Sequence, residues 1–246
     1  MNSWQIIFIL ICFAIMIVFV GCVDHPSMRT IQFSGHDWWV KSNVTPAGPG
    51  PNFFSDSSNN VWIDEKGRLH MKITQNGDRW ESAEIVSNES FGYGEYVFTL
   101  ASDPESLDPE IVLGLFTWDD KPDYSHREID IEFSRWEILN NLNSQNVVQP
   151  WNYPGNIDRF DVRANGATTT HSFTWQPDGI TFKSYFGPYS SQPDQNNLIN
   201  TWEYKGKNNP LPGQENARIN LWLVNGRHPT NGKESEIIIE QFKFIP

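Results

Sequence analysis

Hydrophobic and polar residues alternate along most of the chain after residue 60, in short runs separated by turn residues. A period of two places successive side chains on opposite faces of a β-strand. The pattern predicts strands over nine segments: 61–63, 69–73, 93–100, 111–118, 128–133, 172–175, 180–185, 219–224 and 236–244. No helical period of 3.6 residues dominates after residue 21. We therefore expect an all-β protein.

The spacing of these segments indicates how the strands are arranged. Turn residues at 64–67 and 176–179 separate two pairs of them, as in β-hairpins. Many short strands at this spacing favour an antiparallel β-sandwich of the jelly-roll kind, whose concave face suits a linear polymer. The Pro-, Asn- and Gly-rich stretches at 140–160 and 187–214 are predicted to be loops at its rim. No linker or repeat interrupts residues 30–246, so one core is expected.

Residues 1–22 differ from the rest of the chain. Residues 1–21 contain no charged side chain, and residues 6–20 are almost wholly apolar. This composition is typical of an export signal, and 19–22 (Phe-Val-Gly-Cys) resembles a bacterial lipobox, in which the cysteine is lipidated. We expect an exported protein, either secreted or held at the cell-surface membrane by a lipid on Cys22. An uncleaved anchor helix is the alternative.

Cysteine usage and charge narrow the chemistry. Cys12 and Cys22 are the only cysteines, so residues 30–246 can form no disulfide, thiol catalyst or Cys-based zinc site. The chain has a formal net charge of −12, which argues against nucleic acid as a partner but does not repel a neutral polymer. Eleven tryptophans suit stacking on sugar rings, although filling of a β-sandwich core explains them equally well.

The segment Glu128-Ile129-Asp130-Ile131-Glu132-Phe133 is the most informative part of the sequence. On a strand, its apolar residues face the core, and Glu128, Asp130 and Glu132 share the other face. Like charges side by side repel, and acidic residues form strands poorly, so stability alone does not select this row. A solvated acidic face on an edge strand is the alternative. Carboxylates spread along one extended strand cannot converge on a single Ca²⁺ ion.

The spacing of this acidic row suits glycoside hydrolysis. At about 3.3 Å per residue, the Cα atoms of Glu128 and Glu132 are roughly 13 Å apart. Side chains that lean inward by about 4 Å bring the carboxyl groups to about 5 Å, the separation typical of retaining glycosidases. Asp130 between them raises the proton affinity of a neighbouring carboxyl group. One glutamate can then act as nucleophile while the other holds a proton.

The chain resembles glycoside hydrolase family 16, in the branch of lichenases and endo-β-1,3(4)-glucanases. The resemblance covers nearly all residues after 30. Besides the acidic row, it rests on the motifs at 51–54, 83–85, 91–96, 114–118, 171–175, 178–180 and 220–222. It implies a concanavalin A-like jelly roll with Glu128 as nucleophile, Asp130 as electrostatic helper and Glu132 as general acid/base. The acidic row lacks the extra residue of the bulged laminarinase type.

Further site residues are carried over from the same resemblance. The substrate-binding candidates are Asn52, Glu84, Phe116, Trp118, Asn152 and Trp222. Phe116 and Trp222 could instead be plain core, and Asn52 and Glu84 surface polar groups. Two departures concern specificity: Val86 stands where lichenases tend to have an arginine, and His126-Arg127 where Trp-Asp is usual. His126 either contacts sugar or Glu128, or is a loop residue without a role.

The resemblance also bears on cofactors and partners. Catalysis needs no cofactor or metal, and a structural Ca²⁺ near Glu240 is compatible with the family. The expected partner is a polysaccharide, with a β-1,3- and/or β-1,4-glucan as the favoured substrate and a monomer as the expected state. A transglycosylase would use the same residues. A non-catalytic lectin on this fold would have no reason to retain three crowded carboxylates.

Overall fold

The computed structural model describes residues 28–246. The export, lipidation and anchor predictions for residues 1–22 lie outside this range. Within it, no helix is both long and apolar enough to cross a bilayer.

The described chain is built from β-strands and short 3₁₀ turns. The strands are β1 (Thr30–Phe33), β2 (His36–Val40), β3 (Phe53–Phe54), β4 (Val61–Ile63), β5 (Leu69–Asn76), β6 (Arg79–Ser90), β7 (Gly94–Leu100), β8 (Ile111–Trp118), β9 (Ile129–Phe133), β10 (Ser144–Val148), β11 (Ile157–Phe160), β12 (Thr169–Gln176), β13 (Gly179–Phe186), β14 (Leu198–Tyr204), β15 (Asn216–Leu223) and β16 (Ser235–Ile245). The 3₁₀ helices are η1 (Pro104–Ser106), η2 (Ser125–Arg127), η3 (Gln195–Asn197) and η4 (Val224–Gly226).

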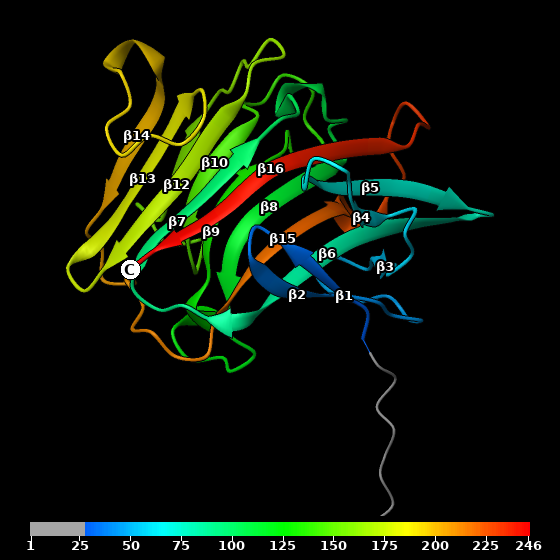
Figure 1. The fold of residues 1–246 in the computed structure, drawn as a ribbon, viewed down its shortest axis with the longest axis horizontal. Coiled ribbons are helices and arrows are strands. Elements are labelled where there is room, and N and C mark those ends of the chain that lie inside the picture. Colours follow the sequence, from blue (N-terminus) through cyan, green and yellow to red (C-terminus); the bar gives the residue numbers. More distant parts are fainter. Residues whose placement is uncertain (1–27) are drawn as a thin grey trace, which may run out of the picture.

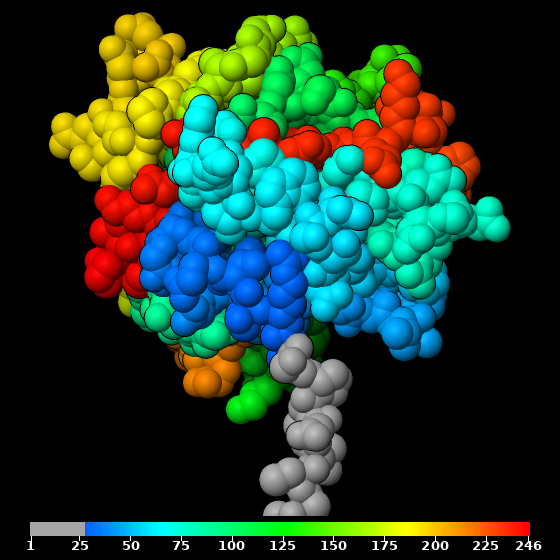
Figure 2. Space-filling view, turned by 45° about the vertical axis from the view of Figure 1, so that its right-hand side comes forward, coloured from blue at the N-terminus to red at the C-terminus, as the bar shows by residue number. Residues whose placement is uncertain are grey.

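These strands form a sheet that folds over itself into two layers (Figure 1). One layer runs in the order β11-β10-β9-β8-β15-β6, and the other runs β5-β16-β7-β12-β13-β14. All pairs are antiparallel except β3 with β6. In the face shown by Figure 2, the first strands (blue) lie beside the last residues of the chain (red), where Ser34 Oγ accepts a hydrogen bond from the Phe242 amide. The predicted antiparallel jelly-roll sandwich is confirmed.

The hydrophobic core lies between the two layers. Alternate residues of the site-bearing strands enter it, including Ile85, Leu115, Ile131 and Ile219, each with no exposed surface. Successive side chains of a strand point to opposite faces. The neighbours of these core residues therefore stand on the outer face of the β6-β15-β8-β9 layer. Core packing is thus what presents the acidic row away from the core.

All nine predicted segments overlap strands, but the two long loop predictions were wrong in part. Segment 140–160 contains β10 and β11, and segment 187–214 contains β14. The inner face of β10 is polar: Asn146 hydrogen-bonds Asp158 and Asn200. These contacts provide hydrogen-bond partners for a buried amide. Polar residues can therefore face inward on β10, and the strand shows no hydrophobic alternation in its sequence.

A histidine is buried in the core behind β9. His171 is fully buried; its ring nitrogens contact the hydroxyls of Ser184 and Thr169 at 2.8 and 2.9 Å. Its ring meets Phe133 edge-on, with centroids 4.7 Å apart. Burial lowers the pKa of His171 from 6.5 to about 3, because the charged imidazolium is poorly solvated there. The folded protein therefore holds this ring neutral.

We expect His171 to make the fold sensitive to acid. Between pH 6.5 and about 3, His171 binds a proton in the unfolded chain but not in the folded chain. The free energy of unfolding is therefore undiminished above pH 6.5 and falls as the pH decreases. The loss reaches about 5 kcal/mol near pH 3. Urea unfolding across this range should show a shallower dependence of the unfolding free energy on pH for His171→Gln than for wild type. Substituting the exposed His228 is the control, and equal slopes for wild type and His171→Gln would contradict the prediction.

Candidate active site

A cavity of about 480 Å³ opens on the outer face of the β6-β15-β8-β9 layer; we call it the cleft. Seven predicted site residues line it: Glu84, Phe116, Trp118, Glu128, Asp130, Glu132 and Trp222. Six further residues complete the lining: Lys41, Gly48, Pro49, Gly114, Arg218 and Asn220. Three other grooves, two of about 770 Å³ and one of about 620 Å³, are larger, but none contains a row of carboxylates on one strand.

The acidic row stands on β9 and the residue before it. Glu128 has extended backbone angles and directly precedes the strand. Asp130 is buried, and Glu128 and Glu132 are half-buried. Asp130 lies opposite Phe116 on β8, and Glu132 lies opposite Gly114. The alternation along β9 therefore places the three carboxyl groups in one cavity, as the sequence predicted.

Two glutamines from the far side of β9 hold the acidic row. Gln145, opposite Glu132 on β10, donates from Nε2 to Glu132 Oε2 at 2.7 Å. Gln149 donates from Nε2 to Asp130 Oδ2 at 3.2 Å. The backbone N–H of Trp151 donates to Gln149 Oε1 at 2.8 Å, which orients the Gln149 amide so that its NH₂ faces Asp130. Neither glutamine was predicted, because no local pattern distinguishes them.

The environment raises the proton affinity of all three carboxyl groups. Burial, and then repulsion from Glu132, raise the pKa of Glu128 to about 8. Burial raises the pKa of Glu132 to about 7, against the hydrogen bond from Gln145. Burial and both neighbouring glutamates raise the pKa of Asp130 well above its usual range. Because like charges this close cannot all ionise, the acidic row retains protons near neutral pH.

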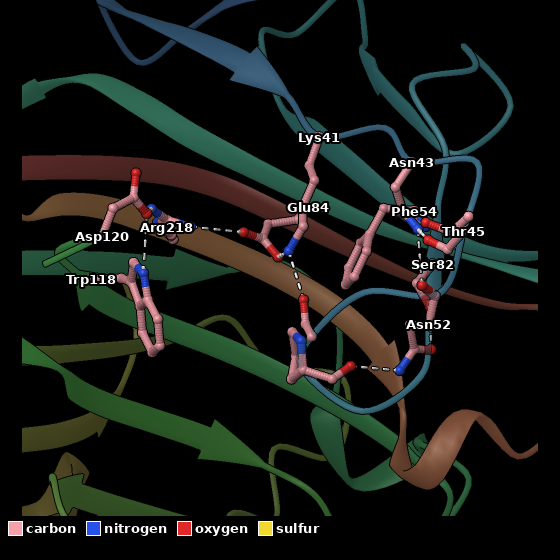
Figure 3. A network of polar contacts seen from close by, with 12 residues as sticks. Lys41, Asn43, Thr45, Asn52, Phe54, Ser82, Glu84, Trp118, Asp120 and Arg218 are labelled. Atoms are coloured by element: carbon pink, nitrogen blue, oxygen red, sulfur yellow. Dashed lines mark hydrogen bonds and ion pairs between the residues drawn. The ribbon is translucent and has the colours of Figure 1, made fainter. Parts of the chain in front are cut away.

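The opposite wall of the cleft is an ion-pair network (Figure 3). Glu84 on β6 is 1% exposed, and each of its oxygens meets a cation. Lys41 Nζ lies 2.7 Å from Oε2 and Arg218 Nη1 lies 3.4 Å from Oε1. Lys41 Nζ also donates to the carbonyl of Gly48 at 2.8 Å. The two cations hold the Glu84 carboxylate in place as a hydrogen-bond acceptor beside the acidic row.

A glycine leaves room for a polar side chain between the two walls. Asn220 on β15 lies between Glu84 on β6 and Gly114 on β8. A Cβ atom at Gly114 would come within 2.5 Å of Asn220 Oδ1. That oxygen is buried and accepts no hydrogen bond from any residue in 28–246. Asn220 thus offers an unpaired acceptor to a hydroxyl-rich ligand.

Trp118 and His126 form one end of the cleft. Their rings stack 4.0 Å apart at an angle of 8°, so the imidazole covers one face of the indole. His126 Nδ1 donates to the carbonyl of Asp119 at 2.8 Å. Four consecutive residues, 124–127, have positive φ angles, and the buried ion pair of Arg127 with Asp119 (2.9 Å) secures this turn. His126 packs against Trp118 and makes no hydrogen bond to Glu128.

Two predicted site residues do not line the cleft. Asn52 is 2% exposed, and its Nδ2 donates to the carbonyls of Pro49 and Leu223, both at 2.8 Å. Its Oδ1 accepts from Ser82 and from the Leu223 amide. Asn52 therefore ties the loop before β3 to the end of β15. Asn152 is exposed in the turn after β10.

The site also contains residues that were not predicted. Arg218 and Asn220 lie four and two positions before Trp222 on β15, so the period of two would have identified them as cleft residues. Lys41 follows β2 and has no comparable signal. Glu240 is exposed, and no three His, Cys, Asp or Glu residues within 28–246 converge on one point.

The chain resembles proteins of known structure, although no family model and no curated protein matches its sequence. A β-glucanase from Bacillus licheniformis is 18% identical with a TM-score of 0.59, covering 85% of this chain and 92% of its own. A β-1,3-1,4-glucanase (lichenase) from a mouse hindgut metagenome is 18% identical with a TM-score of 0.60 and the same coverage.

A third solved structure carries a different functional description. The immunostimulatory antigen and pseudo β-1,3-glucanase of Mycobacterium tuberculosis is 20% identical with a TM-score of 0.62, over 85% of this chain and 90% of its own. The chain therefore has the jelly-roll fold of the lichenase-type β-glucanases, as its resemblance to glycoside hydrolase family 16 implied.

Proposed function

We propose that this protein is a retaining endo-β-glycosidase that hydrolyses internal linkages of a β-1,3- and/or β-1,4-glucan. The observation that carries the proposal is the acidic row, three carboxyl groups on one face of one strand inside a single cavity. Aromatic side chains and unpaired or charge-held acceptors surround it, which is the composition of a site for a neutral sugar chain. The fold shared with β-glucanases supports the same class.

The mechanism uses two displacements at the anomeric carbon. The Glu128 carboxylate attacks that carbon while the Glu132 carboxyl group gives its proton to the glycosidic oxygen, whose bond to carbon breaks. A covalent glycosyl ester on Glu128 results. Water then donates a proton to the Glu132 carboxylate and attacks the same carbon, releasing Glu128. Asp130, whose pKa is raised well above its usual range, keeps its proton, and its hydrogen bond to Glu128 favours the ionised form of that carboxyl group.

The raised proton affinities place this chemistry near neutral pH. Turnover requires an ionised Glu128 and a protonated Glu132, so the rate should follow a bell-shaped curve against pH. The pKa of Glu128, about 8, lies above that of Glu132, about 7, so the form that turns over is the minor one of the two singly protonated forms. The optimum lies near these values, well above the range of free carboxylic acids. The two limbs report the coupled acidic row as a whole.

Product stereochemistry tests the mechanism. The enzyme should be offered a panel of β-glucans, with release of reducing ends as the readout and proton NMR of the first product before mutarotation. Two inversions predict a first-formed sugar in the β configuration. An α-configured first product would overturn the double displacement. Products longer than the input oligosaccharide would indicate transglycosylation.

A non-catalytic lectin is the second candidate, favoured by the pseudo-glucanase among the structural neighbours. It predicts binding of the same glucans without release of reducing ends. Isothermal titration calorimetry with glucan oligosaccharides, run beside the activity panel, separates the two functions.

A further inference from the structure

Arg218 lies between the two halves of the site. On β15, it is opposite Val86 of β6 on one side and Phe116 of β8 on the other. Its Nη1 faces Glu84 at 3.4 Å and its Nη2 faces Asp120 at 3.1 Å. Asp120 Oδ1 also accepts from Trp118 Nε1 at 3.2 Å. One guanidinium therefore joins the Glu84 wall to the Trp118 end of the cleft (Figure 3).

The pairing of Arg218 leaves part of its charge available to the cleft. Its side chain is 9% exposed, Glu84 is 1% exposed and the Asp120 side chain is 89% exposed. The exposed ion pair with Asp120 is screened by water and neutralises the guanidinium weakly. Glu84 is shared with a second cation, since Lys41 Nζ lies 2.7 Å from it. Two cations thus face one buried carboxylate, and the excess positive charge lies beside the acidic row.

The charged lining of the cleft shows where this excess acts. It consists of Lys41, Glu84, Glu128, Asp130, Glu132 and Arg218, with Asp120 and His126 at the rim. Arg218 on β15, Phe116 on β8 and Asp130 on β9 are paired in register across three neighbouring strands. Its attraction favours the ionised form of Glu128. Lys41 is held by Glu84, the Gly48 carbonyl and the Phe54 ring.

We propose that Arg218 is a positioning residue that favours the ionised form of Glu128 for attack and, through the same guanidinium, fixes Glu84 as a sugar-binding acceptor. This inference rests on the proposed glycosidase function. It also accounts for Val86, which stands where an arginine is usual in lichenases: the directly paired position on the neighbouring strand supplies the cation instead.

The two roles of Arg218 predict different kinetic effects. Arg218→Gln removes the cation, so the acid limb of the kcat/KM profile should move about one unit to higher pH. Arg218→Lys keeps the charge but loses the planar fork. Its acid limb should stay near that of wild type while KM for glucan rises. Titration of the Glu128 side chain by ¹³C NMR reports the same shift without relying on turnover.

A matched substitution distinguishes this electrostatic role from a purely structural one. Asp120→Asn removes the negative partner of Arg218, so the acid limb of this variant should move to lower pH, opposite to that of Arg218→Gln. A structural defect would give both variants the same loss of activity with unmoved limbs. In the double variant Val86→Arg/Arg218→Val, an arginine from the paired position should restore the limb.

The outcomes separate this inference from the proposed function. If wild type releases reducing ends and the acid limb of Arg218→Gln coincides with that of wild type, the role of Arg218 is wrong and the glycosidase stands. If wild type has no activity on any glucan, the proposed function fails. The NMR titration of Glu128 then still decides whether Arg218 controls its ionisation. Circular dichroism confirms that each variant is folded.

Discussion

Glu128→Ala should lose turnover of natural glucan by on the order of 10⁴-fold or more while remaining folded. Without the carboxylate, no covalent intermediate can form, and the remaining polar groups of the cleft supply binding alone. Initial rates of reducing-end release at the pH optimum measure the loss. Glu203→Ala is the matched control, since that exposed glutamate on β14 pairs with Lys205 and lies outside the cleft.

Azide tests which glutamate is the nucleophile. In the Glu128→Ala variant, azide can enter the space of the missing carboxylate and attack an activated β-glycoside from the opposite side to the leaving group. The expected product is an α-glycosyl azide, identified by NMR. A β-glycosyl azide would exchange the roles of Glu128 and Glu132, and full activity of the variant would remove Glu128 from catalysis.

Glu132→Gln should stabilise the fold at alkaline pH while lowering activity by about 10²–10⁴-fold. In wild type, burial raises the pKa of Glu132 from 4.5 to about 7. Between these values the folded protein binds a proton that the unfolded chain has lost. Its stability therefore falls as the pH rises through this window. The neutral glutamine avoids this destabilisation, which reaches about 3 kcal/mol above pH 7.

Urea unfolding at pH 4 and pH 8 measures this effect. The two proteins should have similar unfolding free energies at pH 4, where the Glu132 carboxyl group is protonated in both states. At pH 8 the variant should be the more stable. A gain of equal size at both pH values would point to packing instead of charge, and no gain at pH 8 would contradict the raised proton affinity. Crowded carboxylates thus favour catalysis at the expense of stability.

The acidic row could be predicted from six consecutive residues, because a period of two is a local property of the backbone. Once 128–133 is a strand with Ile129 and Ile131 in the core, Glu128 and Glu132 must share the other face. Applied to β15, the same rule would have identified Arg218 and Asn220 as cleft residues on the face of Trp222. The nine segments miss seven strands: β1, β2, β3, β6, β10, β11 and β14. In β10 the reason is that inward polar side chains are satisfied by partners far away in sequence, as Asn146 is by Asn200.

The sequence by itself determined the all-β class, the antiparallel sandwich and the presence of three carboxylates on one strand face, since all follow from local periodicity. Only the tertiary structure decided what surrounds that strand. It paired β15 with β6, so that Arg218 stands beside Val86, and brought Lys41 to Glu84 across 43 residues of chain. It also placed Asn52 outside the cleft, where its side chain joins the loop before β3 to the end of β15. Such long-range contacts depend on strand register and core packing, and no short stretch of sequence encodes them.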